Sequence, residues 1–180
     1  MADDDVPGNP ITEGGALPPA GDDPAAPAGP RPRGVKMELS RIIISELQDQ
    51  QIIVLHEVDG PRQFPIVIGS PEAVAIDRRL KGIVHARPLT HDLLATTVEA
   101  LGGTIDRIEI HNLQDHTFFA RIIIRRRPRV AVDGNGKPVK QVQGEDEWIE
   151  VDSRPSDALA VGVATNVPVY VAEHVLADVS

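Results

Sequence analysis

One stretch near the C-terminal end of the chain constrains the fold most. Residues 148–151 read Trp-Ile-Glu-Val, which is typical of a strand, and Pro155 then ends the extended run. Ser156 is expected to be the N-cap of a helix, and Asp157 to lie in its first turn, where a negative charge faces the positive end of the helix dipole. The helix that follows is nearly all apolar, so it should be buried. Gly162 within it indicates close approach to another backbone.

A similar arrangement occurs earlier in the chain. Arg87 and Pro88 precede Thr90 and Asp92, so an arginine, a hydroxyl group and a carboxylate again meet at the start of an expected helix. Helix N-termini are suited to anions. The spacing differs by inserted residues, so the two segments are not an internal repeat.

The remaining pattern predicts strands with a few helices placed irregularly between them. Strands are expected at 35–44, 52–58, 63–68, 104–113, 117–126, 148–152 and 167–171, and helices from 70 to 82, 90 to 101 and 157 to 165, with a last helical turn at 174–177. Pro65 indicates an edge strand, and Asp133 to Gly136 a turn. This order predicts an α+β fold: one compact domain with a mixed or antiparallel sheet and about three helices.

The apolar residues of the first two expected helices fall on single stripes, which should face the core. The inward-facing residues are expected to be Ala73, Ile76 and Leu80 in the first helix, and Leu94, Thr97, Val98 and Leu101 in the second.

Residues 1–34 differ in composition from the rest of the chain. They hold eight of the sixteen prolines, six of the fifteen glycines and six acidic residues against Arg31 and Arg33, and they contain no aromatic residue. Such a segment buries too little apolar surface to offset the entropy of ordering it. We therefore expect a disordered acidic tail over 1–34 and a folded domain over 35–178.

Composition also bounds the partners. The chain has no cysteine, which excludes disulfides and thiolate metal sites, and no apolar stretch long enough to span a membrane, so we expect a cytoplasmic protein without a membrane partner. The net charge of −9 is unfavourable for binding RNA or DNA through the phosphate backbone. The basic run at 125–129 is either a charged strand edge that resists aggregation or a patch that contacts phosphates.

Candidate chemistry comes from the two helix starts. If they lie together, Asp92 and Asp157 could hold one Mg²⁺ or Mn²⁺, His91 could act as a general base, and Arg87 and Arg154 could bind a phosphate. In the alternative interpretation, both aspartates interact with the helix dipoles and both arginines pair with them.

A second, weaker metal candidate lies further along the chain. It consists of Glu109, His111, Asp115 and His116, of which only Glu109 and His111 share a strand face.

Several segments together resemble the bifunctional nuclease family. They read ARPLTHDLL at 86–94, DHTFFA at 115–120, VDSRPSDALA at 151–160, FPIVIG at 64–69 and PVYV at 168–171. The resemblance covers about residues 35–175. It implies a compact α+β domain that self-associates, so a homo-oligomer is expected, and an ability to cleave RNA and DNA. Mapped onto these motifs, the catalytic residues would be His91, Asp92 and Asp157, the metal ligands Asp92 and Asp157, and the substrate-binding residues Arg87, Thr90, Arg154 and Ser156.

Three functions are consistent with these observations. The first is a metal-dependent nuclease that hydrolyses phosphodiester bonds of RNA and DNA. The second is a non-catalytic oligomeric module that binds a protein partner or a small anionic ligand at the two Arg-Pro corners. The third, which has less support, is a regulatory protein whose acidic tail mimics nucleic acid. The resemblance favours the first function, whereas the acidic composition and the scarcity of aromatic residues favour the second.

Overall fold

A computed structural model describes residues 29–45, 50–83, 85–128 and 145–179. The strands are β1 (Val35–Ile43), β2 (Gln50–Glu57), β3 (Gln63–Gly69), β4 (Gly103–Gln114), β5 (Thr117–Arg126), β6 (Glu147–Ser153) and β7 (Val169–Val171). The helices are α1 (Ser70–Leu80), α2 (Thr90–Ala100), α3 (Pro155–Thr165) and α4 (Glu173–Val179). The expected turn at 133–136 and most of the expected tail lie outside the described residues.

The strands form one seven-stranded sheet in the order β3-β2-β1-β7-β4-β5-β6. All neighbouring strands run antiparallel except β4 and β7, which are parallel, so the sheet is mixed and the α+β prediction is confirmed. Pro65 lies on β3, at the edge of the sheet, as its missing N–H predicts. The last helical turn is longer than expected and forms α4.

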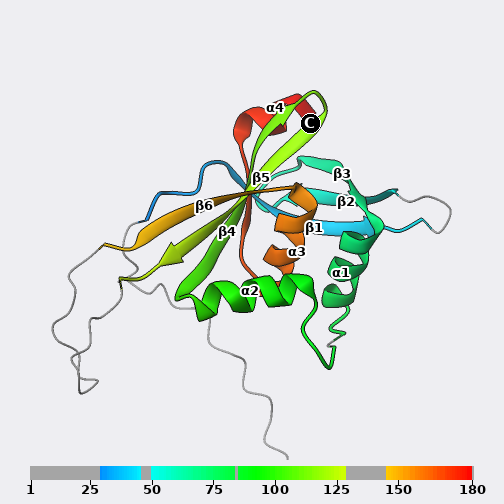
Figure 1. Cartoon of the computed structure of the whole chain (residues 1–180). Coiled ribbons are helices and arrows are strands. Elements are labelled where there is room, and N and C mark those ends of the chain that lie inside the picture. The colour runs from blue at the N-terminus through cyan, green and yellow to red at the C-terminus, as the bar shows by residue number, and fades with distance from the viewer. Residues whose placement is uncertain (1–28, 46–49, 84, 129–144, 180) are drawn as a thin grey trace, which may run out of the picture.

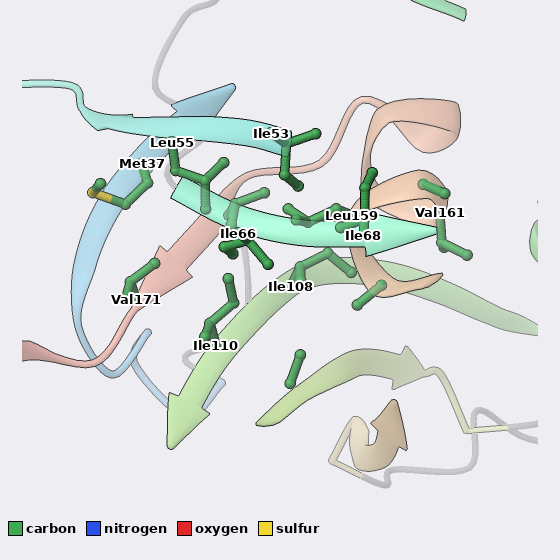
Figure 2. Packing of buried hydrophobic residues seen from close by; sticks show 14 of the residues in the cluster. Met37, Ile53, Leu55, Ile66, Ile68, Ile108, Ile110, Leu159, Val161 and Val171 are labelled. Carbon is green, nitrogen blue, oxygen red and sulfur yellow. The ribbon is translucent and has the colours of Figure 1, made fainter. Parts of the chain in front are cut away.

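The hydrophobic core lies between the sheet and α3. In Figure 1 the sheet curves, with α3 against it and α2 across the lower end. Figure 2 shows side chains of β2, β3, β4 and α3 converging on one interior, with Leu159 and Val161 of α3 near Ile68 and Ile108. A Cβ atom added to Gly162 would lie 2.9 Å from Cγ1 of Ile108. The packing at Gly162 is tight, as predicted, but its partner is the side chain of Ile108 on β4 and not another backbone.

Helices α1 and α2 pack against α3. In each helix fewer residues of the apolar stripe are buried than predicted. Ala73 and Ile76 are fully buried, but Leu80 is 54% exposed, so its predicted inward position is wrong. Leu94 and Leu101 are 42% and 62% exposed and were also wrongly predicted to face inward. The short side chain of Ala95 makes the buried contact of α2 instead, because α2 crosses only one end of the sheet and α3.

No helix in the described part of the chain is long and apolar enough to cross a membrane.

Candidate functional site

One contact joins the first turn of α2 to the first turn of α3, the two helices that follow the Arg-Pro corners. His91, in the first turn of α2, places Nε2 3.8 Å from Oδ1 of Asp157, in the first turn of α3. Both side chains are partly buried. At 3.8 Å the two groups are in close contact, at a separation longer than a hydrogen bond.

The arginine of the second corner is occupied by protein carboxylates. Arg154 donates from Nε to Oδ2 of Asp157 at 2.6 Å and from Nη2 to Oδ1 at 3.0 Å. Its Nη2 also donates to Oε1 of Glu72, on α1, at 2.8 Å. These hydrogen bonds, that to Asp157 first, raise the pKa of Arg154 above its usual range. At this corner, the interpretation of arginine and aspartate as structural partners matches the contacts.

The predicted cap of α3 is wrong. Arg154 is the N-cap, with extended backbone angles, and Pro155 is the first helical residue, so the helix begins before the serine. Proline has no N–H to leave unsatisfied and its fixed φ suits this first position. Ser156 is therefore inside the helix and only 8% exposed, and its predicted contact with a substrate stays a prediction.

The first corner also caps its helix differently from the prediction. Leu89 is the N-cap of α2, and Thr90 is the first helical residue and exposed. The carboxylate of Asp92, and not the hydroxyl group of Thr90, caps this helix. Its Oδ2 accepts a hydrogen bond from the backbone N–H of Leu89 at 3.1 Å. Arg87 is exposed and makes no ion pair with any residue the structure describes. The two corners are therefore alike in sequence but not in contacts.

A pocket of about 410 Å³ lies between α1, α2 and α3. Its polar lining comprises Arg78, Arg79, His85, His91, Asp92 and Thr96. Nη1 of Arg78 lies 3.4 Å from Nε2 of His85, and Nη2 of Arg79 donates to the backbone oxygen of Ala164 at 2.8 Å. Neither arginine forms an ion pair within the described ranges. The pocket therefore offers an anion two arginines without an ion-pair partner in the described ranges, beside the carboxylate of Asp92.

Comparison with known proteins places the chain in a family. Residues 53–180 match the model of the bifunctional nuclease domain. The chain belongs to this family. It is also 36% identical over 137 residues to proteins from two strains of Mycobacterium tuberculosis, covering 76% of this chain and 71% of theirs. Both relatives are described as uncharacterized. All residues of the corners and of the pocket fall inside the matched region of the bifunctional nuclease domain.

Sequence reasoning missed the pocket cations of this bifunctional nuclease domain. None of Arg78, Arg79 and His85 was among the predicted site residues. A signal was present: between residues 78 and 87 the chain carries three arginines, a lysine and a histidine and no acidic residue. Such a local excess of cations in an acidic chain indicates an anion site.

The proposed pair of metal ligands lies at the two helix starts, but each carboxylate is already used. Both oxygens of Asp157 accept hydrogen bonds from Arg154, and one oxygen of Asp92 accepts the N–H of Leu89. In the described parts of the chain no three His, Asp or Glu side chains are grouped so that they could hold a metal ion. A cation shared by Asp92 and Asp157 would have to displace Arg154, and this assignment stays a prediction.

The second metal candidate contains a buried ion-pair network. Glu109 is 1% exposed; its Oε1 accepts from Nε of Arg107 at 2.7 Å and its Oε2 from Nη2 of Arg121 at 2.7 Å. Burial by itself raises the pKa of Glu109. The two guanidinium groups lower it by a larger amount, so the pKa of Glu109 lies below its usual value. Asp115 and His116 form the β4–β5 turn with positive φ angles. The surroundings of Glu109 are those of a structural carboxylate.

The basic run is not a strand edge, because β5 has β4 on one side and β6 on the other. Acidic residues at the start of β6 and just before it face two of its arginines: Arg126 pairs with Glu147, and Arg125 lies 3.8 Å from Asp146. Pairing across strands thus explains part of the run without a phosphate ligand. Arg129 lies outside the described residues.

Proposed function

We propose that this bifunctional nuclease domain hydrolyses phosphodiester bonds of RNA and DNA in the pocket between α1, α2 and α3. The observation that carries the proposal is the His91–Asp157 contact at a pocket whose two arginines have no ion-pair partner in the described structure. A histidine close to a carboxylate and to two arginines is a combination suited to attack on a phosphate ester.

His91 is the general base of the proposed reaction. It takes a proton from a water molecule while the water oxygen forms a bond to phosphorus. The bond between phosphorus and the leaving ester oxygen breaks, and that oxygen takes a proton from solvent, which leaves a phosphomonoester and an alcohol. Asp157 orients the imidazole and stabilises the imidazolium that forms. Proton transfer of this kind contributes roughly 10²–10⁴-fold in rate.

Arg78 and Arg79 bind the non-bridging phosphate oxygens in this proposal. Guanidinium groups make short, charge-assisted hydrogen bonds to phosphate and neutralise the charge that grows on its oxygens as water attacks. Because neither arginine is committed to a carboxylate of the described chain, binding a phosphate breaks no existing ion pair. Arg154, held by Asp157 and Glu72, instead fixes the carboxylate that orients His91.

A divalent metal, Mg²⁺ or Mn²⁺, remains part of the proposal at Asp92 and Asp157. When bound, it would neutralise charge on the phosphate and lower the pKa of a bound water. Asp157 would then have to release Arg154. A chelator separates this version from cleavage that depends on His91 alone.

The test is an assay on single-stranded RNA and DNA with the purified full-length protein, with and without EDTA. His91→Gln and Asp157→Asn should each reduce cleavage at least about 100-fold. The matched control is His174→Gln, an exposed histidine on α4, which lies at the opposite end of the molecule from α2. Cleavage that survives both site variants contradicts the proposed site.

A non-catalytic module is the second candidate, and the occupied Arg154 corner favours it. Two carboxylates already saturate that guanidinium, and the chain carries a net charge of −9. In this case the same pocket binds an anion without cleaving it. Binding that depends on Arg79, together with no turnover under any metal condition, would support the module over the nuclease.

A further inference from the structure

We infer that the pocket takes a dinucleotide-sized phosphodiester, not the backbone of a long single strand or a duplex. This inference rests on the proposed function, because it names the substrate class of the same site. Three features of the pocket support it: its volume, the position of its charges and the kind of apolar surface that lines it.

The volume fits a small ligand. Pockets of roughly 300–1,000 Å³ enclose ligands of drug size, and this pocket has about 410 Å³. Three helices enclose it: α1 contributes Arg78 and Arg79, α2 contributes His91 and Asp92, and α3 contributes alanines. A nucleotide and its phosphate match these dimensions.

Carboxylates accompany the positive charge of the pocket. Asp92 lines the pocket itself, and Arg79 and Asp92 also line a neighbouring hollow of about 330 Å³ together with Glu99. Arg154, which does not line the pocket, is compensated by Glu72 and Asp157. A long polyanion that extends past Arg79 therefore meets carboxylates, whereas proteins that hold long strands provide a continuous cationic groove.

The apolar lining gives no track for successive bases. The pocket is lined by Ile83, Pro88, Leu89 and several alanines; its aromatic rings are the small imidazoles of His85 and His91, and no Phe, Tyr or Trp is among its described lining residues. Proteins that bind long single strands stack base after base on aromatic rings. The aliphatic wall can contact one base or ribose but offers no stacking platform for the next, which again favours a short ligand.

The experiment measures binding to the full-length His91→Gln variant, so that turnover does not interfere. The probes are a dinucleotide with a 5′-phosphate, a 20-nucleotide single strand and a 20-base-pair duplex, each titrated at several salt concentrations. The strand should bind no more than about 20-fold tighter than the dinucleotide, which is roughly its number of binding registers. Two arginines that bind phosphates should give the single strand a slope of about −1.4 when the logarithm of its association constant is plotted against the logarithm of the salt concentration.

Charge variants locate the site. Arg78→Gln and Arg79→Gln, made in the same background, should each weaken dinucleotide binding about 10-fold, the loss expected for a charge-assisted hydrogen bond. Arg41→Gln is the matched control: it removes the same charge from an exposed position of β1 that does not line the pocket. Equal effects of the three variants would overturn the inference.

The failure of the inference and the failure of the proposed function look different. Binding of the strand or the duplex more than about 100-fold tighter than the dinucleotide, with a slope steeper than about −3, overturns the small-ligand inference. Cleavage of the 20-nucleotide strand that depends on His91, with an intact dinucleotide, also overturns it but leaves the nuclease standing. Tight, Arg79-dependent dinucleotide binding without cleavage by the wild-type protein supports the inference and contradicts the nuclease.

Discussion

Two groups of arginines in this bifunctional nuclease domain have opposite surroundings. Arg154 is 69% exposed yet is held by Asp157 and Glu72, whereas Arg78 and Arg79 line a pocket and have no ion-pair partner in the described chain. An arginine in the sequence motif, Arg154, is thus paired within the protein, whereas the arginines without an ion-pair partner among the described residues, Arg78 and Arg79, lie outside the motif. A guanidinium that already binds two carboxylates must break those contacts before it can bind a phosphate.

The network around Glu109 is the extreme case of pairing. Arg107 and Arg121 both bind this carboxylate on the sheet face opposite to Ile108, and Arg107 lies 5.7 Å from the ring centroid of Trp148. A Cβ atom on Gly29 would clash with the same ring, so the chain before β1 passes against Trp148. The charges of Glu109, Arg107 and Arg121 therefore stabilise the fold, because each buried charge is compensated by the others.

The largest expected effect comes from breaking that network. Glu109→Gln removes the charge that compensates two largely buried arginines, so we expect the free energy of unfolding to fall by about 3–5 kcal/mol. Urea denaturation measures it. The control is Glu150→Gln, whose half-exposed carboxylate also binds Arg121 and should contribute less than about 1 kcal/mol. Equal effects of the two variants would show that burial does not distinguish the pairs.

The same network gives a pH dependence. The pKa of Glu109 is lowered in the folded state, so its stabilisation is present above the unfolded-state pKa of about 4.3 and is lost as pH falls through the folded-state value. The stability difference between the wild type and Glu109→Gln should therefore be constant near neutral pH and shrink in acid. Urea midpoints of both proteins at a series of pH values measure it; a difference that grows in acid would contradict the assigned direction.

A smaller effect is expected from moving α3, which carries Asp157 and the alanine wall of the pocket. Gly162→Leu forces a side chain against Ile108 and should lower the free energy of unfolding by about 1–3 kcal/mol. Dinucleotide binding should weaken as well, because the pocket wall moves with the helix. Ala100→Leu, at an exposed position of α2, is the control and should stay within about 0.5 kcal/mol. Unchanged dinucleotide binding by Gly162→Leu would show that the pocket does not depend on the position of α3.

The smallest effect is expected from Arg154→Gln. Its ion pairs are exposed and screened by solvent, so the denaturant midpoint should not change measurably. Ligand binding should also be retained, in contrast to Arg79→Gln, while cleavage should fall because Asp157 loses the partner that fixes it. If Arg154→Gln weakens ligand binding as much as Arg79→Gln does, the distinction between paired and free arginines fails.

The candidate site was predictable only in part. The two corners were correctly identified as helix starts from proline and aspartate, and His91 of the first helix turn contacts Asp157 of the second. The caps were assigned to hydroxyl groups because serine and threonine are good N-caps, but Pro155 begins its helix earlier and Asp92 supplies the cap of α2. The pocket could not be predicted, because its walls come from three helices that meet only in the folded chain.

The sequence by itself determined the elements and their class. Alternating apolar residues, Pro65 on an edge strand and tight packing at Gly162 follow from local sequence, whereas the partner of Gly162, Ile108 on β4, does not. The tertiary structure decided which charges are free. Arg154 is compensated by Glu72, 82 residues away along the chain, and Glu109 by an arginine of the next strand. Electrostatic interaction depends on distance in space, so only packing of α1 beside α3 could pair one arginine of the chain and leave Arg78 and Arg79 to a ligand.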